Sequence, residues 1–151
     1  MFYRELKPIS KRFQHEALKV NGLDRNRLCR EGADPAKAMA DARSWIIDNS
    51  TEGAPVLVAY PLSFDWSWLY WYFMKFVAGG SPFNHSQCFD LKTAYAVKAE
   101  VPIVRAGRAR LPALLRPPAS RHTHNAADDA IEQARIFARV FRWGRSNERD
   151  R

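Results

Sequence analysis

The sequence has few cysteines and no long hydrophobic run, and each absence excludes a class of protein. The most apolar run, residues 69–78, has about half of the roughly 20 residues that a transmembrane helix needs, and Lys75 interrupts it. The opening residues, MFYRELKPISKRF, are charged where a signal peptide has an apolar core. Cys29 and Cys88 fit no metal-ligand pattern, so we expect two buried or inert thiols. These features predict a cytoplasmic protein without a membrane span.

The composition also excludes a fibrous architecture, and it excludes disorder for most of the chain. Of the 151 residues, 46% are hydrophobic and 26% are charged, which is close to the average of a globular domain. This length suits one domain. We expect that domain over residues 1–143, followed by a basic disordered tail over residues 144–151, GRSNERDR.

Acidic residues are absent between Glu100 and Asp128, in a chain whose net charge is +8. The acid-free stretch contains five arginines: Arg105, Arg108, Arg110, Arg116 and Arg121. Because the planar guanidinium can bind two phosphate oxygens at once, the stretch is typical of a nucleic-acid-binding surface. A solvated, proline-rich loop is the alternative interpretation.

The apolar spacing predicts strands that alternate with helices, which is an α/β arrangement. Strands are expected at residues 2–9 and 55–60, the second buried on both faces. Helices are expected at residues 35–48, 65–78 and 127–143, with short helical pieces around Gly22 and a further short element at residues 89–97. The expected buried stripes of the first and last long helices are Ala38, Met39, Ala42, Trp45 and Ile46, and Ile131, Ala134, Phe137, Ala138 and Phe141.

Asp65 follows the buried strand directly and stands at the start of the next helix, beside Phe64 and Trp66. Active sites of α/β proteins form at this edge of a sheet, and a carboxylate among aromatic rings is costly without a partner. The alternative is that Asp65 caps its helix. The aromatic residues that follow could stack on unpaired bases, but at helical spacing most of them are expected to face the core.

A second candidate group lies at the start of the last helix. His124 precedes Asp129 by five residues in HNAADDAIEQA. A histidine near a metal-binding carboxylate is suited to activating a water molecule as a general base. Two alternatives stay open: Asp128 and Asp129 could complement the helix dipole only, or His122, His124 and an aspartate could bind zinc.

The segments FDWSWLYWYF and HNAADDAIEQA resemble the second and third motifs of the DEDDh, DnaQ-like 3'–5' exonucleases. The segments FYRELKPIS, VLVAYPLSFDW and FDLKTAYAVK are also similar to a bacterial branch of that family, so the resemblance reaches to about Trp143. It implies a ribonuclease H-like fold, a three-layer sandwich with a mixed central sheet. It also implies that the substrate is DNA or RNA, with single-stranded 3' ends.

By this resemblance, Asp65 and Asp129 match metal-binding carboxylates of a site for two Mg²⁺ or Mn²⁺ ions. His124 matches the general base. Asp90 matches a position that we interpret as structural, a cap for the helix that follows its strand.

The first motif of that family, Asp-x-Glu on a central strand, is absent from these 151 residues. The chain opens at what resembles the third strand of the fold, so the first two strands are missing as well. Three explanations are open: an upstream start, a degenerate gene, or a partner chain, including a second copy in a homodimer, that completes the sheet. We favour the first, because Asp65, His124 and Asp129 are all present.

These observations predict a metal-dependent 3'–5' exonuclease domain that is inactive or weak in this form, because half of the metal ligands are missing. The alternative is a non-catalytic nucleic-acid-binding or interaction module that uses the arginine stretch. A hydrolase of short oligonucleotides is a third candidate. The Asp-x-Glu motif in the upstream reading frame would discriminate between the first two.

Overall fold

The computed structural model describes residues 1–50, 53–117 and 125–144. The chain divides into two compact units. Unit 1 comprises Met1–Leu57 and Ser63–Phe89, and unit 2 comprises Val58–Leu62 and Asp90–Arg151. Helices and a small parallel sheet confirm the α/β class. The ribonuclease H-like sandwich and the single domain over residues 1–143 stay predictions.

The strand predicted at residues 2–9 of unit 1 is wrong. Leu6 forms an isolated parallel bridge with Ala33, in which Lys7 N–H donates to the Ala33 carbonyl at 2.8 Å. The bridge cannot extend, because Ala33 lies between helix α2 (Arg25–Glu31) and helix α3 (Pro35–Asp48). The close approach requires a glycine beside it, since a Cβ on Gly32 would lie 2.7 Å from the Lys7 nitrogen.

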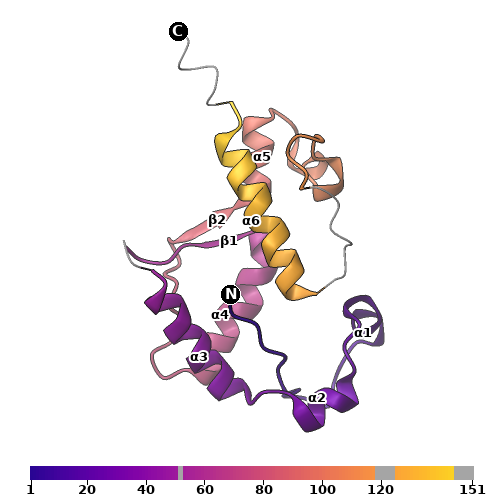
Figure 1. Ribbon diagram of the computed structural model, residues 1–151, viewed down its shortest axis with the longest axis vertical. Coiled ribbons are helices and arrows are strands. Elements are labelled where there is room, and N and C mark those ends of the chain that lie inside the picture. The colour runs from indigo at the N-terminus through magenta and orange to yellow at the C-terminus, as the bar shows by residue number, and fades with distance from the viewer. Residues whose placement is uncertain (51–52, 118–124, 145–151) are drawn as a thin grey trace. The chain divides into compact units, whose positions relative to one another are not determined.

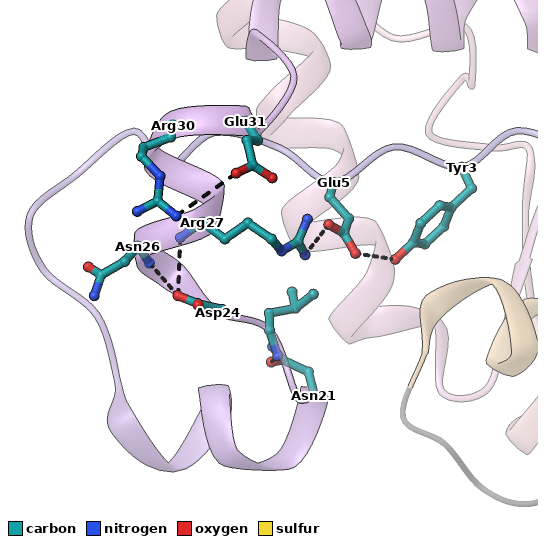
Figure 2. Close-up of polar contacts among 9 residues, drawn as sticks. Tyr3, Glu5, Asn21, Asp24, Asn26, Arg27, Arg30 and Glu31 are labelled. Atoms are coloured by element: carbon teal, nitrogen blue, oxygen red, sulfur yellow. Dashed lines mark hydrogen bonds and ion pairs between the residues drawn. The ribbon is translucent and has the colours of Figure 1, made fainter.

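The two short helices predicted around Gly22 are confirmed. Helix α1 (His15–Asn21) ends at Gly22, whose φ of 68° is left-handed. Figure 2 shows how the start of α2 and the opening segment are connected. Asp24 caps α2 by accepting from the Asn26 and Arg27 backbone, and Arg27 pairs with Glu5 at 2.5 Å.

The helix predicted from Asp34 and Pro35 is confirmed as α3, with the Asp34 side chain accepting from Lys37 N–H. Its stripe is largely as expected, because Ala38, Met39 and Ala42 are buried. Trp45 is the exception: it is exposed and lies against Phe2, with the ring centroids 6.2 Å apart.

The core of unit 1 forms between α3 and helix α4 (Leu62–Phe76), which Figure 1 shows side by side. Phe73 of α4 is fully buried and meets Phe83 edge to face. The aromatic residues of α4 divide between two faces. The core side takes Trp66, Tyr72, Phe73 and Phe76, and the exposed side takes Phe64, Trp68, Tyr70 and Trp71. None of the helices described in the structure has the length and apolar character needed to cross a membrane.

The sheet pairs β1 (Leu57–Ala59) with β2 (Cys88–Asp90). The expectation that the first of these strands is buried on both faces is wrong. Ala59 and Tyr60 are buried, but Val56 is 53% exposed. Among the described residues β1 has a single neighbouring strand, so only its end is enclosed.

In unit 2, helix α5 (Leu91–Lys98) packs beside helix α6 (Ala126–Arg142) (Figure 1). The arginine-rich segment contains two short 3-10 helices, η1 (Ile103–Arg105) and η2 (Arg108–Arg110). The stripe predicted for α6 is wrong, because Ile136 and Val140 are its buried residues, whereas Ile131 and Phe141 are exposed. Helix α5 and the backbone of Tyr60 both contact α6, and neither contact is visible in the sequence.

The two cysteines are both free. Cys29 is exposed, so of the two expected alternatives burial does not apply to it, and its inertness stays a prediction. It follows the buried Leu28 in α2, so it points away from the side that packs. Burial raises the pKa of the Cys88 thiol. The tail predicted over residues 144–151 lies, apart from Gly144, outside the described residues.

Candidate functional site

Asp65 lies in the first turn of α4, in unit 1, and is half-buried. Because α4 begins at Leu62, three residues earlier than expected, Asp65 is inside the helix rather than its N-cap. A carboxylate in this turn interacts favourably with the positive end of the helix dipole. Its side chain therefore has a structural benefit without being a cap.

Asp129 lies in the first turn of α6, in unit 2. It is half-buried, whereas its neighbour Asp128 is exposed. The cap of this helix is Asn125, whose side chain accepts from Ala127 N–H at 2.9 Å. Since Asn125 performs the capping, neither aspartate is needed as the N-cap.

Gln133 is a residue that the sequence did not single out. It lies one turn after Asp129 on the same side of α6, followed by the buried Ile136 and Val140. Its side-chain oxygen accepts from the backbone N–H of Tyr60 at 2.9 Å. This bond connects the end of β1 to the helix that carries Asp129. The sequence does contain one signal for this role: Gln133 is a polar residue four positions after Asp129, on the side of α6 that also carries Ile136 and Val140.

Tyr60 is anchored a second time through its side chain. It is 4% exposed, and its hydroxyl donates to the Ala106 carbonyl at 2.6 Å. Burial, followed by the influence of Tyr95 and Asp90, raises the pKa of Tyr60 to about 12. The phenol therefore stays protonated at neutral pH, as its hydrogen bond to the Ala106 carbonyl requires.

Asp90 is the N-cap of α5, as predicted. It also makes a second contact, which the sequence did not predict. Its Oδ1 accepts from Thr93 N–H, and its Oδ2 accepts from Leu62 N–H, both at 2.6 Å. Burial alone would raise the pKa of Asp90. The hydrogen bonds from Thr93 and Leu62, with the charge of Lys92, outweigh it and hold that pKa below its ordinary value. Asp90 thus fixes both the start of α5 and the segment that leads into α4.

Among residues 1–50, 53–117 and 125–144 there is no group of three or more His, Cys, Asp or Glu side chains that could hold a metal ion. Asp65 and Asp129 are oxygen donors of the kind that Mg²⁺ prefers. His122 and His124 lie outside the described residues, so both the general-base assignment and the zinc alternative stay predictions.

Four of the five predicted arginines lie in the described part of unit 2. Arg105, Arg110 and Arg116 are exposed, while Arg108 pairs with Glu132 of α6 at 3.4 Å. Arg121 lies outside the described residues. The segment is more than a solvated loop, because three of its other side chains are almost fully buried: Ala106, Leu111 and Leu115. The arginines are therefore held on a packed backbone.

No family model matches the sequence. The sequence is 32% identical, over 147 residues, to the 3'–5' DNA exonuclease Cap18 of Escherichia coli. The match covers 97% of this chain and 77% of that relative. The chain belongs to this 3'–5' exonuclease family.

Membership of this family confirms the resemblance carried by FDWSWLYWYF and HNAADDAIEQA at the level of 3'–5' exonucleases. The narrower DEDDh assignment stays a prediction, and so do the roles of Asp65, Asp129 and His124. Gln133 and the second contact of Asp90 come from the structure alone, because both bonds join segments that are distant in the sequence.

Proposed function

We propose that this protein is a metal-dependent 3'–5' exonuclease domain of the DEDDh type, which hydrolyses phosphodiester bonds of DNA. The observation that carries the proposal is the match to a 3'–5' DNA exonuclease along 97% of the chain. The two free cysteines agree with the reducing cytoplasm, where we propose that it acts.

Asp65 and Asp129 would hold Mg²⁺ or Mn²⁺ through their carboxylate oxygens. Both are half-buried in the first turn of a helix, which supports the assignment. When bound, two such ions stabilise the attacking and the leaving oxygen of a phosphodiester. His124 would take the proton of the attacking water. The exposed side chains of Arg105, Arg110 and Arg116 would bind the phosphate backbone of the DNA.

The missing Asp-x-Glu motif limits this chemistry. Two carboxylates are half of the set that the DEDDh assignment requires, so the 151 residues alone should bind the ions weakly and cleave slowly. A non-catalytic DNA-binding module is the second candidate, and the same missing motif favours it. An Asp-x-Glu encoded upstream of Met1 in the same frame would support the first candidate, and its absence there the second.

The test is a cleavage assay on 5'-labelled single-stranded DNA with Mg²⁺ or Mn²⁺. We expect little shortening by the 151-residue chain and clear shortening by a chain that also carries the upstream Asp-x-Glu. In that active chain Asp129→Asn should lower the rate more than about 100-fold, since even an outer partner of a metal ligand contributes 10–100-fold. The matched control, Asp128→Asn, should stay near the wild-type rate because Asp128 is exposed.

Two results would contradict parts of the proposal. Fast release of nucleotides by the 151-residue chain, lost in Asp129→Asn, would support the activity and show that the missing motif is not needed for it. Equal rates for Asp129→Asn and the unsubstituted chain would remove Asp129 from the metal site.

A His124→Ala variant tests the general-base role of His124. We expect a lower kcat with little change in KM.

A further inference from the structure

An open, shallow surface cavity of about 680 Å³ lies in unit 2 between the arginine-rich segment and α6. Two of its lining residues are Arg116 and Arg139, and the others are Ala113, Leu114 and Pro117. Both arginines are oriented by backbone contacts. Arg116 Nε donates to the Leu111 carbonyl at 2.6 Å, and Arg139 donates to the Arg116 carbonyl. Each guanidinium has five N–H donors, so each has further donors for a ligand.

Neither arginine pairs with an acidic side chain among the described residues. After Glu132, helix α6 carries Arg135, Arg139 and Arg142 and no acid. Both guanidiniums line one cavity, so an anion bound there would interact favourably with two positive charges. Arg116 and Arg139 belong to two basic groups that are separate in the sequence, so only the fold brings them to one cavity.

The chemistry of the lining matches one segment of a single DNA strand. The guanidinium fork binds two oxygens of a phosphate, and the exposed apolar side of Leu114 can contact a sugar or a base. Arg139 lies ten residues after Asp129 on α6. That is about 15 Å along the helix axis, which corresponds to a few nucleotides of an extended single strand.

We propose that this cavity binds a phosphate of single-stranded DNA a few nucleotides before the 3' end. The position rests on the proposed function, which places the 3' end at Asp129. Substrates long enough to reach the cavity are held by Arg116 and Arg139, and shorter ones are not. The site therefore makes the protein selective for length.

The test measures binding without catalysis. A labelled dinucleotide and a labelled octanucleotide of deoxythymidine are titrated at low salt with excess Ca²⁺ in place of Mg²⁺, so that the ion positions are filled while cleavage is slow, with fluorescence anisotropy as the readout. Arg116→Gln and Arg139→Gln should each weaken octanucleotide binding about tenfold, the effect of one charged hydrogen-bonding partner. Each should also reduce the salt slope by about 0.7. Dinucleotide binding should not change.

The matched control is Arg142→Gln, which removes the same charge from the same helix outside the cavity lining. Its loss should be about twofold. Equal losses in all three variants would mean a diffuse charge effect and would overturn the proposal. If the dinucleotide lost as much affinity as the octanucleotide, the proposed distance of the site from the 3' end would be wrong. If the unsubstituted protein did not bind the octanucleotide, the site itself would be wrong.

Two further measurements keep the result interpretable. Circular dichroism identifies a variant that does not fold. In that case Arg139→Lys, which keeps the charge and a donor but loses the fork, replaces Arg139→Gln and should show a smaller loss. Because the titration follows binding and not cleavage, the proposal on exonuclease activity is tested separately. A protein with the expected binding pattern and no cleavage in any form would contradict that activity and leave the cavity assignment standing.

Discussion

Units 1 and 2 are stabilised in different ways. The core of unit 1 is filled by large aromatic side chains, with Phe73 and Phe83 at its centre. The core of unit 2 is mostly aliphatic, and side chains there form hydrogen bonds to the backbone of distant segments. Examples of these bonds are Tyr60 to Ala106, Gln133 to Tyr60 and Lys98 to Val140. The long-range polar contacts of unit 1, such as Arg27 with Glu5 and Lys7 with Ala33, lie outside its aromatic core. Because hydrogen bonds are directional and apolar packing is not, we expect the geometry of the core to be fixed most closely in unit 2.

The largest effect is expected from emptying the aromatic core of unit 1. Phe73→Ala should lower the free energy of unfolding by about 3–5 kcal/mol, because Phe73 is fully buried and its removal leaves a cavity. Urea unfolding followed by tryptophan fluorescence measures the change. The matched control on the same helix is Phe64→Ala, where the ring is 67% exposed and the loss should be below about 1 kcal/mol. Equal losses would show that α4 does not have one packed side.

An intermediate effect is expected from the long-range bond of unit 2. Gln133→Leu fills a similar volume but leaves the N–H of the buried Tyr60 without its acceptor, which costs about 1–3 kcal/mol. Gln133→Glu keeps an acceptor and should recover most of the loss. In unit 1, the exposed Gln14 makes no side-chain cap bond, so Gln14→Leu should change stability by less than about 0.5 kcal/mol. If Gln133→Leu also falls in that range, the contrast between the units is wrong.

The smallest effect is expected at two capping aspartates, one in each unit. Asp90 accepts two backbone hydrogen bonds through two oxygens, and an asparagine has one acceptor oxygen, so Asp90→Asn should cost about 1 kcal/mol. Asp34 accepts one such bond, and asparagine caps helices as well as aspartate does. Asp34→Asn should therefore be nearly neutral. The comparison fails if the two substitutions have equal effects.

Asp90 also predicts a dependence on pH. Its pKa is lower in the folded protein than in the unfolded chain, so the ionised carboxylate stabilises the fold above about pH 4. That contribution is lost as the pH falls from there through the folded-state pKa. The difference in unfolding free energy between the unsubstituted protein and Asp90→Asn should therefore shrink in this acidic range.

Local signals in the sequence were sufficient for several elements. Asp34 and Pro35 predicted the start of α3, Gly22 predicted the break after α1, and Asp90 was correctly interpreted as a cap. Each of these depends on residues within one turn of one another. The strand expected at residues 2–9 failed for the opposite reason, because a strand requires a partner of sufficient length elsewhere in the chain.

The sequence by itself determined the α/β class, the exonuclease family resemblance, and the positions of Asp65 and Asp129 at helix starts. Only the tertiary structure decided which side of α6 is buried, that Gln133 connects this helix to Tyr60, and that Arg116 and Arg139 line one cavity. The physical reason is the range of the interactions. Caps and turns depend on neighbouring residues, whereas the covered side of a helix and the convergence of two arginines depend on which distant segments pack against each other.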